Sequence, residues 1–281
     1  MTSKYLPIIM LHHVDDHPHE SIAPYTLSRR KFDLLLNYIE DHGYQTTTFE
    51  DLVLDQNANL HFKKKIVLTF DDCPTPLFEY AIPELVRRKM KAVFYLPTAY
   101  IGTYNVWDVE GNNMAKVNVM DETQIKQLVS LGMEVGTHSD RHIKLSQVSP
   151  KVAFEEMHVS KNKLESIVGK SVYSIAFPFG EIPTNFKKTV GDAGYKYGLA
   201  IYSPEQHQYS LRRVGIVESD NHLSLAFKLS TAYNTLRTIA YPIYSLKAKI
   251  FGNAKWKRTD DLYKIWALFI KIAFIEYTLI T

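Results

Sequence analysis

Short apolar runs alternate with amphipathic stretches along most of the chain. A short run of aliphatic, β-branched or aromatic residues is typical of a strand that is buried on both faces of a sheet. Runs of this kind predict strands at residues 6–11, 44–48, 66–72, 91–96, 133–137, 172–177 and 197–201.

Stretches with apolar residues at three- and four-residue spacing separate these runs and predict amphipathic helices. Ser28, a residue type that favours the N-cap, opens the first helix, and Gly43 ends it. Residues 101–120 contain Gly, Asn and Asp and predict a long loop, a feature that often borders the site of a compact enzyme. Further helices are predicted at residues 49–54, 76–89, 121–132, 150–168 and 184–193.

Strands and helices alternate from residue 66 to about residue 217. This order is typical of parallel βαβ units, and it predicts an α/β protein with a barrel-like or doubly wound sheet. In such parallel architectures, functional side chains gather at the carboxyl ends of the strands. We therefore expect the chemistry of this protein at those ends.

The strand at residues 66–72 ends in two adjacent carboxylates, Asp71 and Asp72. An unpaired charge inside a core is costly, so both acids are expected where the strand ends and the chain turns. Taken alone, the pair is typical of a polar turn or a helix cap. Unusual residues at two other strand ends change this interpretation.

His138 and His142 follow the strand at residues 133–137 and stand four positions apart. On one helical turn both imidazoles would face the same side and could bind one metal ion. Together with one Asp they would leave positions open for water, as a catalytic Zn²⁺ site does. The second carboxylate could then act as general base toward that water, whose pKa zinc lowers to about 7. These residues predict a metal-dependent hydrolase.

The composition is compatible with such an enzyme. Of the 281 residues, 46% are hydrophobic and 22% are charged, which is ordinary for a globular protein, and the net charge of +3 is too weak to predict nucleic-acid binding. Cys73 is the only cysteine, so no internal disulfide can form. The N-terminal apolar run is interrupted by Pro7 and ends at His12, unlike a secretory signal, so we expect a cytoplasmic location.

Three motifs occur in order: Leu-Thr-Phe-Asp-Asp at 68–72, His-Ser-x-x-His at 138–142 and Ala-Phe-Pro-Phe-Gly at 176–180. Together they resemble the polysaccharide deacetylases with a NodB homology domain, carbohydrate esterase family 4. The resemblance extends roughly over residues 6–217, and Pro-Ile-Ile-Met-Leu-His-His-Val at 7–14 looks like the first strand of the poly-N-acetylglucosamine deacetylase branch. It implies a distorted (β/α) barrel that removes N-acetyl groups from amino sugars.

The resemblance also implies roles for individual residues. Asp71 would be the catalytic base, and the divalent metal would be Zn²⁺, with Co²⁺ or Ni²⁺ as alternatives. The metal ligands would be Asp72, His138 and His142.

The resemblance implies further residues of the site, for oxyanion stabilisation, for protonation of the leaving amine and for substrate binding. The backbone N–H near Phe179 would help to stabilise the tetrahedral oxyanion. His12 would lie beside the metal site and could protonate the leaving amine or bind substrate, although a capped strand end explains this histidine equally well. Substrate-binding roles are implied for His13, Pro178 and Arg213.

The chain departs from the family's pattern at several positions. Many relatives have glycine after the Asp pair, where this chain has Cys73. The arginine that orients the base in many relatives, at the start of the Pro-x-Gly motif, is Ala176 here. Many members use a late histidine as general acid, whereas His207 and His222 lie in no recognisable motif. Another group must therefore orient Asp71, or activity is low.

Beyond residue 220 the resemblance ends. This predicts a catalytic domain at 1–220 and a basic, apolar extension at 221–281 that we expect to be helical. The extension has nine Lys or Arg against three acidic residues, a charge of +6. Such a surface could rest on an anionic membrane at its inner face, and a helix packed on the barrel or on a second subunit is the alternative. The oligomeric state is left open.

The sequence thus predicts a metal-dependent hydrolase that removes an N-acetyl group from an amino sugar, in a polysaccharide or a lipid-linked glycan. Two alternatives remain. A deformylase would use the same chemistry on a lipid-linked amino sugar. A catalytically weak carbohydrate-binding relative is suggested by Ala176 and the missing late histidine, although the intact Asp and His set argues against it.

Overall fold

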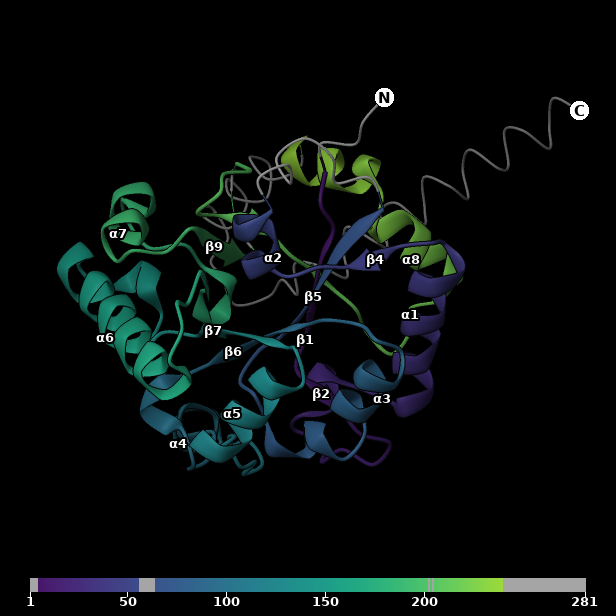
Figure 1. Ribbon diagram of the computed structural model, residues 1–281, viewed down its shortest axis with the longest axis horizontal. Helices are drawn as coiled ribbons and strands as arrows, with labels where there is room; N and C mark the ends of the chain where they lie inside the picture. The colour runs from purple at the N-terminus through teal and green to yellow at the C-terminus, as the bar shows by residue number, and fades with distance from the viewer. Residues whose placement is uncertain (1–4, 56–63, 202, 204, 240–281) are drawn as a thin grey trace, which may run out of the picture. The chain divides into compact units, whose positions relative to one another are not determined.

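The computed structural model describes residues 5–55, 64–201, 203 and 205–239, and its centre is a nearly closed parallel barrel with helices around it (Figure 1). All hydrogen-bonded pairs along the path β10-β9-β8-β7-β6-β5-β1-β11 are parallel. These strands are β1 (Ile8–Leu11), β5 (Lys65–Phe70), β6 (Val93–Leu96), β7 (Glu134–Thr137), β8 (Ser174–Ala176), β9 (Tyr197–Ala200), β10 (Leu211–Arg212) and β11 (Val214–Gly215). The predicted (β/α) barrel is confirmed.

The two ends of this path meet around a single residue, Arg213. β10 pairs with β9, β11 pairs with β1, and Arg213 donates its backbone N–H to the Ala200 carbonyl at 2.9 Å. One short stretch of chain therefore closes the barrel, and Arg213 lies at the closing seam.

Helices lie between most of the strands, and several begin at the capping residues that the sequence indicated. The Ser28 hydroxyl accepts from the Lys31 N–H, Ser149 caps the long helix in the same way, and Asp121 forms a capping box with Gln124. The helices are α1 (Arg29–Asp41), α2 (Phe49–Leu54), α3 (Ala81–Arg87), α4 (Val106–Asn112), α5 (Glu122–Ser130), α6 (Pro150–Val168), α7 (Phe186–Asp192) and α8 (His222–Lys228).

Shorter elements connect these parts. They are the strands β2 (His13–Val14), β3 (Thr26–Leu27) and β4 (Gln45–Thr46), and the 3₁₀ turns η1 (Ala23–Tyr25), η3 (Thr75–Phe78), η4 (Thr98–Tyr100), η5 (Leu145–Gln147) and η6 (Pro178–Gly180).

Two helix predictions need correction. The helix predicted at 76–89 is divided into η3 and α3, because Pro83 lacks an N–H and would clash with the carbonyl four residues earlier inside a continuous helix. In the structure Pro83 lies in the first turn of α3, where proline is tolerated. The loop predicted at 101–120 contains α4, whose few apolar positions are too short a series to show helical periodicity.

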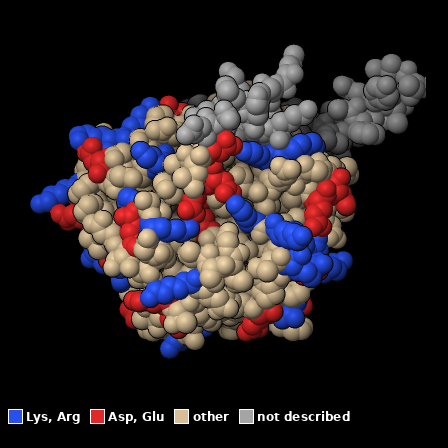
Figure 2. All heavy atoms as spheres, viewed as in Figure 1, with Lys and Arg blue, Asp and Glu red and all other residues tan. Residues whose placement is uncertain are grey.

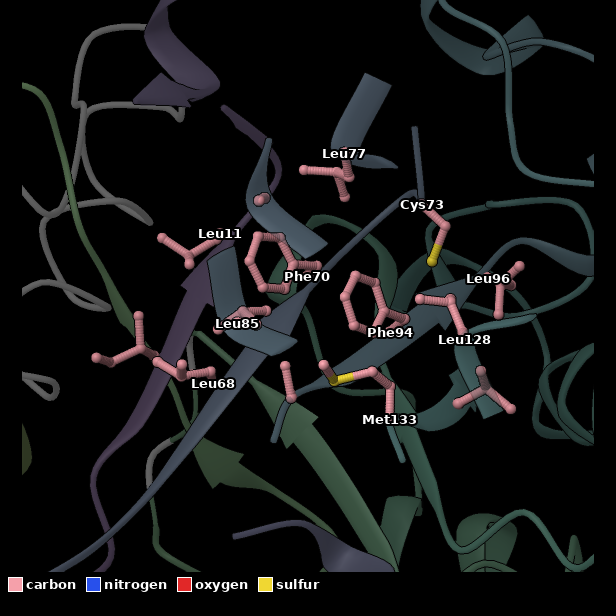
Figure 3. Close-up of a cluster of buried hydrophobic side chains, with 14 of the residues drawn as sticks. Leu11, Leu68, Phe70, Cys73, Leu77, Leu85, Phe94, Leu96, Leu128 and Met133 are labelled. Carbon is pink, nitrogen blue, oxygen red and sulfur yellow. The ribbon is translucent and has the colours of Figure 1, made fainter. Parts of the chain in front are cut away.

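Two layers of buried side chains hold the barrel together. Outward-facing residues of the strands pack with the helices, and Figure 3 shows Phe70 and Phe94 in this layer, with ring centroids 5.0 Å apart. The inner layer includes Val67, Tyr95 and Leu199, and Phe49 of α2 packs with them. Gly136 makes room for Tyr95, since a Cβ at this position would lie 2.3 Å from its ring.

Part of the predicted C-terminal extension belongs to the unit that contains the barrel. This unit runs to Thr235, and Leu225, Leu229 and Tyr233 are buried in the same cluster as the outer layer. The rest of the extension, residues 240–281, lies outside the described residues, so the boundary at 220 and the membrane contact stay predictions. Among the described helices, none is long and apolar enough to cross a membrane.

Candidate active site

The end of β5 directs two adjacent carboxylates to different places. The Asp71 N–H still donates to the Leu11 carbonyl of β1 at 2.9 Å, so this residue continues the sheet and only 2% of its surface is exposed. Asp72 has a φ of 63°, in the left-handed region that Asp tolerates better than most residues. This change of backbone direction separates the two side chains.

Asp71 is held by Arg213 from the closing seam. The guanidinium donates from Nη1 to Oδ1 at 2.6 Å and from Nη2 to Oδ2 at 2.7 Å, and Arg213 is 1% exposed. Such a bidentate pair fixes both position and orientation of the carboxylate. Burial would raise the pKa of Asp71, but the charge of Arg213 outweighs it, with help from nearby imidazoles, and holds this pKa below its ordinary value.

Asp72, His138 and His142 form a cluster that could hold a metal ion. The Asp72 Oδ1 lies 3.3 Å from the His142 Nε2 and 3.7 Å from the His138 Nε2. This oxygen is buried and accepts no hydrogen bond from the described residues, although an unpartnered buried carboxylate oxygen is costly. One oxygen and two imidazole nitrogens converging on one point are a donor set that suits a divalent transition metal.

The tautomer of His138 agrees with this role. Its Nδ1 lies 2.7 Å from the Ala176 carbonyl, which can only accept, so Nδ1 carries the proton and Nε2 keeps a free lone pair. Burial lowers the pKa of His138 to about 4, and the imidazole is therefore neutral near pH 7, as a metal ligand must be.

Aromatic rings enclose His142 on two sides. The Trp107 ring of α4 stacks on the imidazole with centroids 4.4 Å apart and planes 24° apart, and Phe179 meets it edge-on at 5.0 Å. These contacts restrict the His142 ring to one orientation. The segment predicted as a loop at 101–120 therefore does border the site, through Trp107, which the sequence did not indicate as a site residue.

The loop that carries both histidines is anchored to α6. Glu156 is buried and accepts from the Arg141 backbone N–H at 2.9 Å and from its Nε at 2.6 Å. The neighbouring Asp140 accepts from the Thr98 hydroxyl at 2.8 Å. Glu156 was not predicted as a site residue, because a lone acid in a helix gives no signal of a contact with a distant loop.

Backbone strain is concentrated at this end of the barrel. Nine non-glycine residues of the described chain have positive φ, and five of them lie at the ends of β5, β7 and β8. Such conformations are common at functional sites, where the surrounding structure holds them in place. The five residues are Asp72, Cys73, Ser139, His142 and Phe179.

The first strand delivers His12 and His13 to two sides of this site. The His12 Nε2 lies 4.0 Å from the Asp71 Oδ2, and the side chain is 19% exposed, so it can reach both the base and a ligand. His13 begins β2 and lines a cavity with Pro74. Burial, and then the charge of His12, lowers the pKa of His13 to about 4.

The remaining predicted residues take different positions. Pro178 is buried at the start of η6, whereas Phe179 is 39% exposed with a φ of 60°, and no described residue accepts from its N–H. Arg213 was predicted to bind substrate, but its burial against Asp71 fits this role poorly and makes it a support for the base.

The departures from the family's pattern also have structural outcomes. Cys73 is fully buried, and its sulfur points into the hydrophobic cluster near Phe94 (Figure 3). Burial raises the pKa of this thiol well above its ordinary value, which favours a packing role. The late histidines lie apart from the metal-ligand cluster: His207 packs on Phe186, and His222 lies near Tyr38.

Comparison with known proteins identifies relatives of this chain. Residues 59–198 match the family described as polysaccharide deacetylase. The chain is 25% identical over 217 residues to YxkH of Bacillus subtilis (strain 168), which covers 75% of this chain and 71% of that protein. It is 21% identical over 208 residues to the poly-beta-1,6-N-acetyl-D-glucosamine N-deacetylase of Staphylococcus aureus (strain MRSA252), covering 69% of each.

A solved structure shares the fold. The Streptococcus pyogenes deacetylase PplD, in complex with acetate, superposes with a TM-score of 0.67 and 25% identity, over 80% of this chain and 98% of that one. The motifs, the barrel and these matches lead to one conclusion: the chain belongs to the polysaccharide deacetylase family, carbohydrate esterase family 4, whose members carry a NodB homology domain.

Proposed function

We propose that this protein is a metal-dependent hydrolase that removes the N-acetyl group from an amino sugar of a glycan. The observation that carries the proposal is that a fixed carboxylate lies next to the metal-ligand cluster. A buried carboxylate, Asp71, is fixed by Arg213, and its Oδ2 lies 3.9 Å from the Nε2 of His138, a member of the metal-ligand cluster. A base and a metal site this close can act on the same water molecule.

Asp72, His138 and His142 would hold the ion, for which Zn²⁺ fits best and Co²⁺ or Ni²⁺ are alternatives. A divalent ion held there would supply Lewis-acid polarisation of the amide carbonyl and a lower pKa for water. The protein prepares this site in advance, because the Ala176 carbonyl orients His138 while Trp107 and Phe179 confine His142.

The protein's own groups then move the protons. Asp71 accepts a proton from the water whose oxygen attacks the carbonyl carbon, and Arg213 keeps the carboxylate ionised and aimed. The Phe179 N–H donates to the oxygen that becomes negative. His12 gives a proton to the amide nitrogen as the C–N bond breaks, so that acetate and a free amine leave.

Two observations support a glycan as substrate. The Staphylococcus aureus relative is by its name a deacetylase of poly-beta-1,6-N-acetyl-D-glucosamine. On the face drawn in Figure 2, acidic and basic side chains are interspersed, a pattern that offers no broad field of one sign to a highly charged polymer. The bidentate support from Arg213 also removes the main reason, Ala176, to expect a catalytically weak relative.

The test is acetate release from N-acetylglucosamine oligomers, with and without a chelator, combined with measurement of bound metal. Asp71→Asn should keep its metal and lose turnover, whereas His138→Ala should lose both. Full activity in Asp71→Asn would show that another group is the base. Turnover that survives complete metal removal would refute the metal dependence.

We further propose that the protein works in the cytoplasm, with the extension at 221–281 as a peripheral contact with the inner face of the membrane. The support is the charge of +6 on this extension. Flotation with anionic liposomes should bring up the full chain, but not a form that ends at Thr235, where the unit containing the barrel ends. Equal flotation of the two forms would refute the contact.

A further inference from the structure

The side chain of Tyr95 lies in the barrel interior, beside the carboxylate that serves as base in the proposed chemistry. β5 and β6 are parallel neighbours in which Phe70 pairs with Phe94, and both of these rings belong to the outer layer (Figure 3). Asp71 and Tyr95 are the next residues of the two segments, and successive side chains of a strand point to opposite faces. Both side chains therefore point into the barrel, where Tyr95 is fully buried.

The guanidinium of Arg213 lies over the ring of Tyr95. Its central carbon is 5.9 Å from the ring centroid, while its two Nη atoms donate to Asp71. An aromatic face attracts a cation, and the attraction grows where water is excluded, as it is around Arg213 at 1% exposure. Nη1 also donates to the Thr69 hydroxyl, in a longer contact of 3.3 Å. The ring thus covers one face of the guanidinium, and Asp71 occupies its edge.

The Tyr95 ring is held in place from across a neighbouring strand. β7 lies between β6 and β8, and its residue paired with Tyr95 is Gly136. A Cβ at Gly136 would lie 2.3 Å from the Tyr95 ring, so the ring crosses β7 at a position that has no side chain. The hydroxyl then reaches Ser174 of β8, with the two oxygen atoms 2.8 Å apart. The ring is therefore fixed at both ends, by its own strand and by β8.

A short hydrogen-bond chain connects the Tyr95 hydroxyl to the amino end of β7. The Ser174 hydroxyl donates to the Glu134 Oε1 at 3.4 Å, and the Glu134 Oε2 accepts from the Glu50 backbone N–H at 2.8 Å. Burial, and then the charge of Glu134, raises the pKa of Tyr95 well above its ordinary value, so the phenol keeps its proton. Tyr95 can therefore donate to Ser174 while Ser174 donates to Glu134.

We propose that Tyr95 is a positioning residue for the base: its ring holds the Arg213 guanidinium in the orientation that binds Asp71, and Ser174 holds the ring. This inference rests on the proposed function and adds a residue to it. Because Tyr95 is fully buried and acts through Arg213, its loss should slow the chemical step and leave substrate binding unchanged. A displacement of about 1 Å can cost on the order of a hundredfold in rate.

The test measures kcat and KM for acetate release from N-acetylglucosamine oligomers by the zinc-loaded protein. Tyr95→Leu and Tyr95→Met remove the ring and should lower kcat at least about tenfold, with KM within about twofold of wild type. Tyr95→Phe keeps the ring and should lose much less, about threefold at most. The matched control is Phe49→Leu, which removes a ring that packs on Tyr197 in the same inner layer and should keep the wild-type kcat and KM.

A double-mutant cycle separates this inference from the proposed function, because it requires no turnover. Urea unfolding of the wild type, Tyr95→Leu, Arg213→Met and the double variant should show a coupling of about tenfold or more in the unfolding equilibrium constant, as for a cation–π contact without water. Coupling in a wild-type protein that releases no acetate would refute the deacetylase function and leave the support of Arg213 by Tyr95 standing.

Three results would overturn the positioning role. They are additive losses in the cycle, a wild-type kcat in a folded variant without the ring, and equal losses of kcat in Tyr95→Phe and Tyr95→Leu. Circular dichroism establishes the folding of each variant. Tyr95→Met replaces Tyr95→Leu in both measurements if the leucine variant does not fold, since its longer side chain fills more of the space of the ring.

Discussion

The pair of Asp71 and Arg213 offers the sharpest test of how this barrel supports its base. Arg213→Met keeps most of the volume and removes the charge, which leaves the Asp71 carboxylate 2% exposed without its bidentate partner. Breaking a buried ion pair in this way costs roughly 3–5 kcal/mol of folding free energy. Asp71→Asn leaves the Arg213 charge buried instead, so its cost should be similar.

A double-mutant cycle isolates the interaction. Asp71→Asn combined with Arg213→Met leaves no buried charge of the pair, so the double variant should be less destabilised than the sum of the single variants by several kcal/mol, on the order of 3. Urea unfolding of the metal-free protein, followed by circular dichroism, measures all four forms. Additive losses would show that the contact seen in the structure contributes no coupling, and the reasoning would fail.

The same variant should change the pH dependence of activity. Arg213 lowers the Asp71 pKa, so in the wild-type protein this group contributes stability above its ordinary pKa and loses it as the pH falls through the folded value. Without Arg213 burial dominates and the pKa rises, so the acidic limb of kcat/KM should move to higher pH in Arg213→Met. Arg213→Lys keeps a positive charge but cannot donate the two parallel hydrogen bonds to Asp71. Its acidic limb should therefore lie between those of the wild type and Arg213→Met. An unchanged acidic limb in Arg213→Met would mean that this limb reports another group.

Three further predictions concern other parts of the barrel. Burial raises the pKa of Glu134 from 4.5 to about 7, so its contribution to the free energy of unfolding is complete below pH 4.5 and is lost as the pH rises through 7. Glu134→Gln should therefore be about 3 kcal/mol more stable than wild type at pH 8 and equally stable at pH 4, as measured by urea unfolding. Trp107→Leu frees the His142 ring and should weaken zinc binding about tenfold or more, as chelator competition would show. Glu156→Gln loses the charged partner of Arg141 and should likewise weaken zinc binding, while an equal zinc affinity would limit Glu156 to a structural role.

The strands and their polar ends could be predicted because both depend on local patterns. Residues 66–70 are apolar or β-branched without interruption, and the two acids that follow cannot remain in the core without partners. Parallel topology then brings the strand ends together, so Asp72, His138 and His142 could be grouped before their distances were known. This grouping needs only the order of strands, not the packing.

The partner of Asp71 could not be predicted in the same way. Arg212 and Arg213 are adjacent, and a shift of one residue along a strand exchanges the inner and outer faces. The structure turns Arg212 toward the Ser203 carbonyl at 2.9 Å and Arg213 toward Asp71. The sequence does show two arginines in a short apolar strand. Which of them points into the barrel depends on how the barrel closes. Trp107 shows the same limit, since its position depends on the fold of a long connection.

The closing seam explains how the barrel can carry alanine where the family's pattern has arginine. Ala176 is fully buried and packs in the inner layer with Tyr95, and the guanidinium of Arg213 lies 5.9 Å from the centre of the Tyr95 ring. A second guanidinium projecting from β8 would enter this same space and place two cations beside one carboxylate, an arrangement that burial makes costly. The methyl group of Ala176 avoids the conflict, while its carbonyl still orients His138. The cation that orients Asp71 is thus Arg213, which lies between β10 and β11 where the barrel closes, and not a residue of β8.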